Sequence, residues 1–266
     1  MNQIDISFII IEYYTLGDLK KCIESTEAKC LDLSYEIIVS SNSLYPSEKK
    51  SILLNDYKNV RWIFNGKNLG YAGAMNTGIE ISSGKSVVIM NPDARIVSGS
   101  IYSAYKYLMA NQDVGVIGPK IIDLDGKLQD SCRKFMTPVD LFCRVVKRVF
   151  LKKDVLLTQR LDCGKIQPVD WVIGAFMMLN KKAIEKVGLL DNRYFLYVED
   201  MDWCKRFWDC GFKVVYFPNL VVEYKGDRKS ISPAIYVRFI NKYSIYHLRS
   251  YLRFMKKHSF YLYKNQ

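Results

Sequence analysis

Three carboxylate residues, Glu199, Asp200 and Asp202, fall within four consecutive positions where a helix is predicted to begin. The positive end of a helix tolerates acidic side chains, so a solvated helix start would also explain them. Crowded carboxylates raise one another's proton affinity, however, and such a group can remove the proton of a hydroxyl. Aromatic neighbours favour a lined cleft over a bare surface: Tyr194, Phe195, Tyr197 and Trp203. We therefore predict a general base in this segment.

A second candidate site follows an apolar run. Residues 86–90 predict a buried strand, and Asn91, Pro92 and Asp93 come directly after it. A carboxylate at the carboxyl end of a strand is well placed to hold a divalent cation against a diphosphate. The alternative is an Asp that only caps a helix.

The stretch from Asn68 to Gly78 is rich in glycine and other small residues. Glycines allow the backbone to pass close to a ligand, and the amides of a following helix attract phosphate. A tight turn with close helix packing is the alternative. The spacing does not match the GxGxxG pattern of dinucleotide-binding enzymes, which disfavours a nicotinamide-dependent oxidoreductase.

The elements that must position these residues alternate between strands and helices. Strands are predicted at residues 6–11, 36–39, 60–64 and 86–90, and helices at residues 18–25 and 72–82. Apolar strands that alternate with helices indicate an α/β fold with a parallel sheet covered on both faces. Ligands of such sheets bind beyond the carboxyl ends of the strands, where Asn42, Gly70 and Asp93 lie. Residues 1–100 are therefore predicted to form a nucleotide-binding half.

The rest of the chain is less regular. Strands are expected at residues 114–122, 172–179, 213–217 and 220–222, and helices at residues 181–187 and 199–210. We expect residues 101–230 to form an acceptor-binding half, so that one domain spans residues 1–230. A basic amphipathic helical extension is expected at residues 231–266.

Composition excludes several classes of protein. Of 266 residues, 49% are hydrophobic and 25% are charged, which is typical of a globular protein and not of a disordered, collagen-like or coiled-coil chain. Seven scattered cysteines without a CxxC pair argue against a disulfide framework or a zinc ribbon and favour a cytoplasmic protein. No signal peptide or membrane span is expected.

Basic charge gathers at the C-terminal end. The net charge is +12, and residues 225–266 contain ten Lys or Arg and one acid. Residues 235–257 show helical periodicity, with Arg238, Lys242, Arg249 and Arg253 on one stripe. An anionic membrane surface is the expected partner, and a solvated face of a packed helix is the alternative. His247 and His258 are expected to be surface residues without partners.

Four blocks in order resemble the bacterial glycosyltransferase family 2 enzymes of the GT-A fold, and most of all their rhamnosyltransferase-like branch. The blocks are residues 6–14, 68–78, 91–94 and 169–218. The last includes Val-Asp-Trp-Val-Ile-Gly-Ala-Phe-Met-Met and Tyr-Phe-Leu-Tyr-Val-Glu-Asp-Met-Asp-Trp. Two shorter pieces, residues 125–129 and 133–135, also resemble that branch, so the likeness covers roughly residues 5–230.

The resemblance implies an inverting sugar transfer from a nucleoside diphosphate sugar, with Asp200 as the general base. It implies acceptor contacts for Glu199, Asp202, Trp171 and Gly174. The residues implied at the donor are Tyr13, Ser41, Asn42, Gly70, Gly73, Asn76, Asn91 and Asp93. A divalent cation, Mg²⁺ or Mn²⁺, is implied with Asp93 and Glu223 as ligands.

Three positions depart from the pattern of the family. Its members usually carry Asn where Glu12 or Tyr14 stands, and often an Asp for base recognition near Ser41. A His commonly follows the strand where Glu223 stands here. Glu223 is expected either to ligate the cation with Asp93, or to pair with Lys225 or Arg228 while those cations hold the phosphates.

We therefore predict a cytoplasmic enzyme, peripheral on the inner face of the cell membrane. It would move L-rhamnose from a dTDP donor onto a lipid-linked saccharide in the synthesis of a cell-surface polysaccharide such as O-antigen. Two alternatives remain open: another donor, such as UDP-galactofuranose or a UDP-hexose, and a non-catalytic protein that binds glycan or nucleotide. Nucleic acid is disfavoured because no motif that reads it is present. The oligomeric state is left open.

Overall fold

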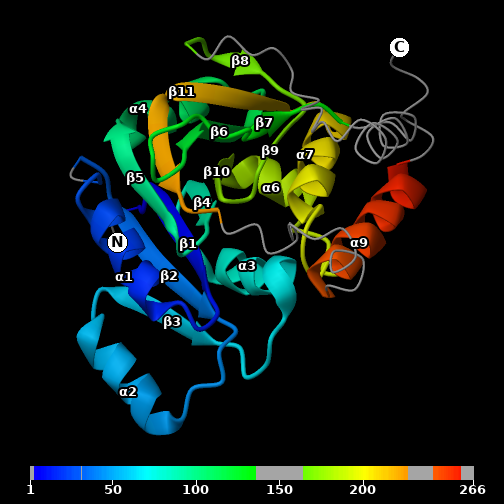
Figure 1. Cartoon of the computed structure of the whole chain (residues 1–266). Helices are drawn as coiled ribbons and strands as arrows, with labels where there is room; N and C mark the ends of the chain where they lie inside the picture. Colours follow the sequence, from blue (N-terminus) through cyan, green and yellow to red (C-terminus); the bar gives the residue numbers. More distant parts are fainter. Residues whose placement is uncertain (1–2, 31, 136–163, 227–241, 259–266) are drawn as a thin grey trace.

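The structure is a computed structural model that describes residues 3–30, 32–135, 164–226 and 242–258 (Figure 1). Its centre is a sheet with the strand order β3-β2-β1-β4-β10-β6-β11-β5. The first four strands of this order are parallel, as predicted. They are β1 (Ile6–Glu12), β2 (Tyr35–Ser41), β3 (Val60–Phe64) and β4 (Ser86–Met90).

The sheet continues with strands of mixed direction. β10 is antiparallel to β4 and β6, and β11 is parallel to β6 and antiparallel to β5. Their bounds are β5 (Ala94–Gly99), β6 (Val114–Ile122), β10 (Phe176–Asn180) and β11 (Lys213–Tyr224). The strands expected at 213–217 and 220–222 are one strand, β11, whose register against β6 shifts between Phe217 and Val221. β5 is absent from the sequence prediction.

The strand predicted at residues 172–179 is wrong as a single element. The structure divides it into β9 (Trp171–Val172) and β10, and residues 173–175 between them leave the ladder. The backbone N–H of Gly174 bonds the side chain of Asp200 in α7, and the carbonyl of Ala175 accepts from the N–H of Asn91, directly after β4. β9 pairs with β7 (Cys132–Arg133), and β8 (Gln167–Pro168) pairs with β11.

Helices cover both faces of the sheet, because alternate side chains of each strand point to opposite faces. Phe8 and Ile10 of β1 pack with α1 and α4, whereas Ile9 packs with α3, α6 and α7. The helix bounds are α1 (Leu16–Glu27), α2 (Ser47–Asp56), α3 (Gly70–Ile81), α4 (Ile101–Ala110), α6 (Lys181–Val187) and α7 (Glu199–Asp209). The sequence prediction of a sheet buried on both faces is confirmed.

The last described helix, α9 (Lys242–His258), lies beside α7 (Figure 1). Residues 235–241 of the expected helix, which include Arg238, lie outside the described residues. No helix within the described ranges is both long and apolar enough to span a bilayer.

Candidate active site

The carboxylate of Asp200 lies in the first turn of α7 and is held by backbone N–H groups. Its Oδ2 accepts from Gly174 at 2.8 Å, and its Oδ1 accepts from Met201 at 2.8 Å. Burial raises the pKa of Asp200 above its usual value, although these hydrogen bonds and the positive charge of Arg133 favour the ionised form. A carboxylate with a raised pKa accepts a proton more readily than an exposed Asp.

Glu199, the residue before it, has a different environment. Its side chain is buried, and its Oε2 has no hydrogen-bond partner within the described part of the chain. Burial, and then the neighbouring charge of Asp200, raise the pKa of Glu199 well above its usual value. Two adjacent carboxylates in one buried site do not both ionise easily. The stronger effect on Glu199 indicates that Glu199 retains a proton more readily and that Asp200 ionises first.

A strained turn directly precedes Glu199 and Asp200 at the start of α7. Tyr197 and Val198 both have left-handed backbone angles, with φ of 69° and 71°. Non-glycine residues pay about 1–3 kcal/mol each for such a conformation, so the surroundings must hold it. The carbonyl of Phe195 accepts from Tyr71 N at 2.9 Å, and the carbonyl of Leu196 accepts from the Ser250 hydroxyl at 3.1 Å.

The second predicted carboxylate, Asp93, follows β4 at the carboxyl edge of the sheet and is half-buried. Two residues earlier, Asn91 donates through its backbone N–H to the Ala175 carbonyl at 3.0 Å. Its side-chain amide donates to the Tyr224 hydroxyl at 3.0 Å. The Asn91 side chain is thereby oriented by the end of β11, a contact that the sequence did not predict.

Two consecutive residues join the two carboxylate regions. Gly174 bonds Asp200 through its N–H, and Ala175 bonds Asn91 through its carbonyl. A Cβ on Gly174 would lie 3.1 Å from the Tyr71 hydroxyl and 3.5 Å from the Cβ of Asp200, so little space remains for a side chain. The structure therefore brings the predicted base, Gly174 and the end of β4 to one edge of the sheet.

Glu223 has a partner that the sequence did not predict. Its Oε1 lies 3.3 Å from Nη1 of Arg95, the residue directly opposite on β5. Arg228, one of the two expected partners, lies outside the described residues. Ligation of a metal by Glu223 stays a prediction, and it would compete with this ion pair.

The possible metal ligands at the carboxyl edge of the sheet could hold a cation in only one way. Among the described residues, no three His, Cys, Asp or Glu side chains gather into a group that could hold a metal ion. Mg²⁺ and related hard cations are often held by one or two carboxylates together with phosphate oxygens and water. Asp93 supplies one such carboxylate, so the site fits a cation that arrives with a diphosphate.

The ends of β1 and β2 form a hydrogen-bonded group around Glu12, whose side chain is fully buried. Its carboxylate accepts from Ser41 Oγ at 2.6 Å, from the Tyr45 hydroxyl at 2.9 Å and from Thr15 N at 2.9 Å. The departure from the family pattern at position 12 thus orients Ser41. Tyr13 next to it is half exposed and retains a free ring surface. The donor contacts of Ser41 and Tyr13 stay predictions.

Asn42 holds the loop that precedes α3. Its side-chain oxygen accepts from Asn65 Nδ2 and Leu69 N, and its amide donates to Asn68 Oδ1 and to the Gly70 carbonyl, all within 3.0–3.2 Å. Each polar atom of this side chain is therefore engaged within the protein. In the structure Asn42 shapes this loop, and its direct contact with a donor stays a prediction.

The glycine-rich stretch packs against the loop at residues 190–195. A Cβ on Gly70 would lie 2.3 Å from the Phe195 carbonyl oxygen, and a Cβ on Gly73 would lie 2.8 Å from that of Leu69. The Asn76 amide donates to the Leu190 carbonyl at 2.8 Å and to Asn192 Oδ1 at 2.6 Å. These contacts agree with the alternative interpretation of this stretch, a tight turn with close helix packing. Donor contact by Gly70, Gly73 and Asn76 stays a prediction.

Asp202 faces away from Asp200, because residues two apart on a helix point to nearly opposite sides. It is fully buried and lies 3.0 Å from Arg206 Nε, 2.8 Å from Lys257 Nζ and 2.8 Å from His258 Nε2. Asp202 therefore anchors α9, and its contact with an acceptor stays a prediction. The expectation that His258 is a partnerless surface residue is wrong, since its helical position places it inward beside Phe254.

Arg133 is a site residue whose role was not predicted from the sequence. Its guanidinium lies over the ring of Trp171, 5.2 Å from the ring centroid, and its Nε donates to Asp130 Oδ2 at 3.0 Å. Trp171 is buried, and its indole N–H donates to the Lys134 carbonyl at 3.1 Å. The sequence signal for Arg133 was the Arg-Lys-Phe piece at residues 133–135. That piece resembles the family but does not indicate a chemical role for Arg133.

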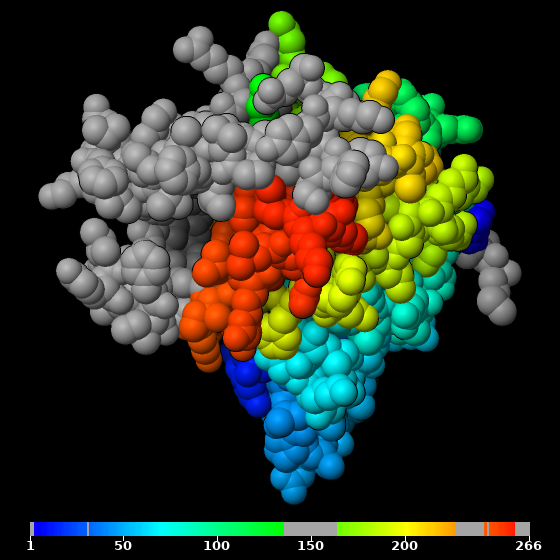
Figure 2. All heavy atoms as spheres, turned by 90° about the vertical axis from the view of Figure 1, so that its right-hand side faces the viewer, coloured from blue at the N-terminus to red at the C-terminus, as the bar shows by residue number. Residues whose placement is uncertain are grey.

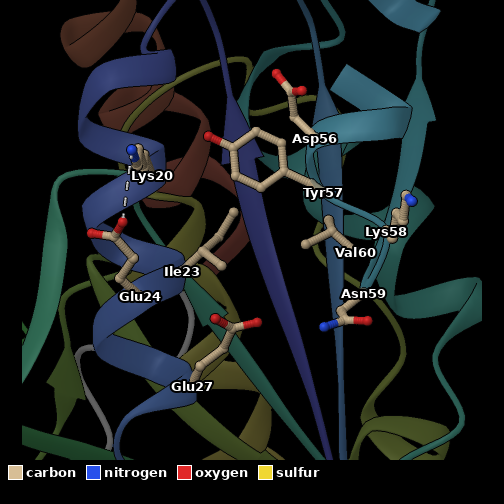
Figure 3. A pocket seen from close by; sticks show the side chains of 9 residues that line it. All are labelled: Lys20, Ile23, Glu24, Glu27, Asp56, Tyr57, Lys58, Asn59 and Val60. Carbon is tan, nitrogen blue, oxygen red and sulfur yellow. Dashed lines mark ion pairs between the residues drawn. The ribbon is translucent and has the colours of Figure 1, made fainter. Parts of the chain in front are cut away.

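A surface cleft of about 280 Å³ lies elsewhere, between α1 and the segment that leads into β3 (Figure 3). Its lining includes Lys20, Glu24, Tyr57 and Val60. Val60 is the first residue of β3, so this cleft opens at the amino end of that strand. It lies at the opposite edge from Asp93 and Asp200 and is not part of the candidate site.

Comparisons with known proteins agree with this arrangement. The family model described as "Glycosyl transferase family 2" matches residues 7–188. The "N-acetylglucosaminyl-diphospho-decaprenol L-rhamnosyltransferase" of Mycobacterium tuberculosis is 28% identical, over 84% of this chain and 80% of the relative. "Rhamnosyltransferase WbbL" of Escherichia coli is 24% identical, over 94% of this chain and 92% of the relative.

Solved structures show the same fold at low identity. A crystal structure of GalNAc-T7 with UDP, GalNAc and Mn²⁺ has a TM-score of 0.63 at 13% identity. It matches 96% of this chain, which spans about half of that chain (48%). S. aureus TarS has a TM-score of 0.56 at 12% identity, and the match covers 85% of this chain and 37% of that one.

A mixed sheet whose first four strands are parallel, with a carboxylate after β4 and a second one at the start of α7, defines a GT-A glycosyltransferase. The chain belongs to glycosyl transferase family 2, whose model matches well over half of it. The predicted fold class and enzyme class are therefore confirmed.

Proposed function

We propose that this glycosyltransferase transfers L-rhamnose from dTDP-L-rhamnose to a lipid-linked saccharide, with inversion at the anomeric carbon. The contrast between the two adjacent acids, Glu199 and Asp200, is the observation that carries the proposal. Asp200 is stabilised as an anion by two backbone N–H groups and a nearby guanidinium, whereas Oε2 of Glu199 has no hydrogen-bond partner within the described residues. Two curated relatives named as rhamnosyltransferases support the sugar, and the decaprenol-linked compound in the name of one supports the acceptor.

In the proposed reaction, Asp200 accepts the proton of the acceptor hydroxyl as its oxygen attacks the anomeric carbon. The bond from that carbon to the diphosphate breaks, and the nucleoside diphosphate leaves with the bonding electrons. This single displacement needs a base on one side and charge neutralisation on the other. Asp200 is bonded to Gly174, and Asn91, two residues before Asp93, is bonded to Ala175, which supports that division of roles.

Asp93 would hold a divalent cation on the donor side. When bound, the cation would neutralise the charge that develops on the leaving diphosphate. Asn91 would orient the same edge through its bond to Tyr224, and the exposed ring of Tyr13 would contact the nucleotide base. Arg133 would hold Trp171 beside the acceptor and keep Asp200 ionised.

A transfer assay tests the proposal directly. The purified chain would be incubated with a prenyl-diphosphate N-acetylglucosamine acceptor and one of three donors, dTDP-L-rhamnose, UDP-galactofuranose or a UDP-hexose, with and without Mn²⁺. Release of dTDP that requires both acceptor and Mn²⁺ supports the proposal. Release of UDP but not of dTDP would show that the donor is a UDP-sugar and not dTDP-L-rhamnose. Binding without any release would indicate the non-catalytic alternative.

A further inference from the structure

The outward side of α9 carries three large apolar residues in contact with solvent. Ile245 is 40% exposed, Leu248 is 57% exposed and Leu252 is 59% exposed. Their spacing of three and then four residues places them on one stripe of a helix. Single exposed apolar residues are ordinary on a protein surface, but an aligned group marks an interaction site.

Basic residues run along the same side. Lys242, Arg249, Arg253 and Lys256 are all exposed, and α9 contains no Asp or Glu. At 100° per residue, these four positions follow the apolar stripe around the helix, so one broad face is half apolar and half cationic. We call the seven residues of the stripe and its cationic border the outer face of α9.

The opposite side of α9 is already occupied. Ser250, Tyr251, Phe254 and His258 are buried, and Lys257 lies 2.8 Å from the carboxylate of Asp202. These contacts fix the rotation of the helix on α7, so the apolar stripe cannot turn inward to become core. Figure 2 shows α9 at the surface of the molecule, in orange and red, beside the yellow segment that contains α7.

We propose that the outer face of α9 docks on an anionic lipid bilayer. Ile245, Leu248 and Leu252 would enter the boundary between headgroups and acyl chains, and the cationic border would meet lipid phosphates. Helices that bind in the plane of a membrane have this division between apolar and basic residues. The membrane would be the surface on which the transferase proposed above works. The docking itself does not depend on that function, but the reason why the enzyme needs a membrane rests on it.

The charges favour a membrane over a second copy of the chain. A twofold interface would place the same face on both partners, so Lys242, Arg249, Arg253 and Lys256 would oppose their own copies. Like charges in such a contact repel one another. Anionic headgroups instead complement all four cations, and the apolar stripe beside them matches the apolar layer below.

Docking at this face would also place the candidate active site near the lipid. Tyr246 of α9 contacts Phe195 with ring centroids 5.1 Å apart, and His247 contacts Tyr197 at 5.4 Å. Both partners belong to the turn that leads into Asp200. A saccharide anchored in the bilayer would therefore reach the base from the side that α9 borders.

Flotation with vesicles tests the proposal. The full chain would be mixed with vesicles of phosphatidylglycerol and phosphatidylcholine in equal parts, and with vesicles of phosphatidylcholine alone. We expect binding to the first and at least tenfold weaker binding to the second. Two variants probe the face: Leu248→Ser with Leu252→Ser, and Arg249→Gln with Arg253→Gln. Each double variant should weaken vesicle binding at least tenfold. For the arginine variant the reason is that each basic residue near a charged surface strengthens binding about fivefold.

A matched control comes from α2, where Ile52 and Leu54 are 48% and 49% exposed. Ile52→Ser with Leu54→Ser should leave vesicle binding unchanged. Unaltered melting temperatures would show that all variants are folded. Wild-type binding that is absent, or equal for the α9 and α2 variants, would overturn the proposal. A dimer in solution that Leu248→Ser with Leu252→Ser dissociates would replace the membrane by a second copy.

The two proposals fail separately. The α9 variants should retain full transfer to a soluble acceptor, because none of the four substituted residues belongs to the candidate active site. If the wild-type chain binds anionic vesicles but transfers no sugar, the proposed function fails and the docking surface stands.

Discussion

The backbone N–H of Gly174 donates to Oδ2 of Asp200 across 2.8 Å. The carbonyl of the same glycine accepts from the Tyr71 hydroxyl, so the peptide groups around Gly174 are fixed from both sides. The carboxylate of Asp200, at the start of α7, is thereby bonded to the segment that joins β9 to β10. The candidate base is thereby oriented before any substrate binds.

Asp200→Asn should lower turnover by about 10²–10⁴-fold, because the amide keeps the shape and loses proton acceptance. The affinity for the nucleotide should stay near that of the wild type. Single-turnover transfer and calorimetric titration with dTDP would measure the two effects. Asp209→Asn, at the other end of α7, is the matched control. Unchanged turnover in Asp200→Asn would remove this residue from the role of base.

Glu199→Gln should stabilise the fold at alkaline pH. Burial raises the pKa of Glu199, so the folded protein retains a proton that the unfolded chain loses above its ordinary pKa of about 4.3. Stability from this group is therefore full at low pH and is lost as the pH rises through the raised pKa. Glutamine does not titrate and needs no proton.

We expect the free energy of unfolding of Glu199→Gln to exceed that of the wild type by about 1–3 kcal/mol near pH 8. The difference should shrink toward pH 4. Urea unfolding at both pH values checks this. A difference that is the same at pH 4 and pH 8 would contradict the assignment of Glu199 as the neutral acid.

Asp93→Ala should weaken the metal-dependent part of donor binding, since Asp93 supplies the carboxylate at the edge of β4. Glu223→Gln should leave the Mn²⁺ requirement unchanged, because Glu223 is engaged with Arg95. The measurement is the Mn²⁺ concentration that gives half-maximal transfer. If Glu223→Gln raises that concentration, Glu223 exchanges Arg95 for the cation and belongs to the metal site.

Asp202→Asn should loosen α9. Although burial alone would raise the pKa of Asp202, hydrogen bonds from His258 and Lys257 and the charge of Arg206 hold it below the usual value. Stability from such a group is present above the unfolded pKa of about 3.9 and is lost as the pH falls through the lowered pKa. Breaking a buried ion pair by removing one partner costs about 3–5 kcal/mol.

Hydrogen exchange of the backbone amides of α9 measures this loss. In Asp202→Asn, amides of residues 246–258 should exchange faster than in the wild type, while those of β1 should not change. Asp209→Asn is again the control. Equal protection of α9 in both variants would show that apolar packing alone holds the helix.

The sequence predicted the parallel strands and the acidic helix start because both are local patterns. The apolar runs of β1 and β4 and the acids at residues 199–202 needed no distant partner to be recognised. It failed where a residue's role depends on what lies opposite. Nothing local indicates that Glu223 faces Arg95, that Asn76 binds the loop at Leu190, or that Asp202 and His258 meet across 56 positions.

β5 has a consequence for how the chain can be divided. It comes from the first hundred residues, yet it pairs with β11 at the far edge of the sheet, beyond β10 and β6. A fragment that ends at residue 100 would carry β5 without its partner strand, and the remaining fragment would expose the edge of β11. Expression of either piece alone should therefore give an aggregation-prone product. Active enzyme should be recovered only when both pieces are produced together and assemble.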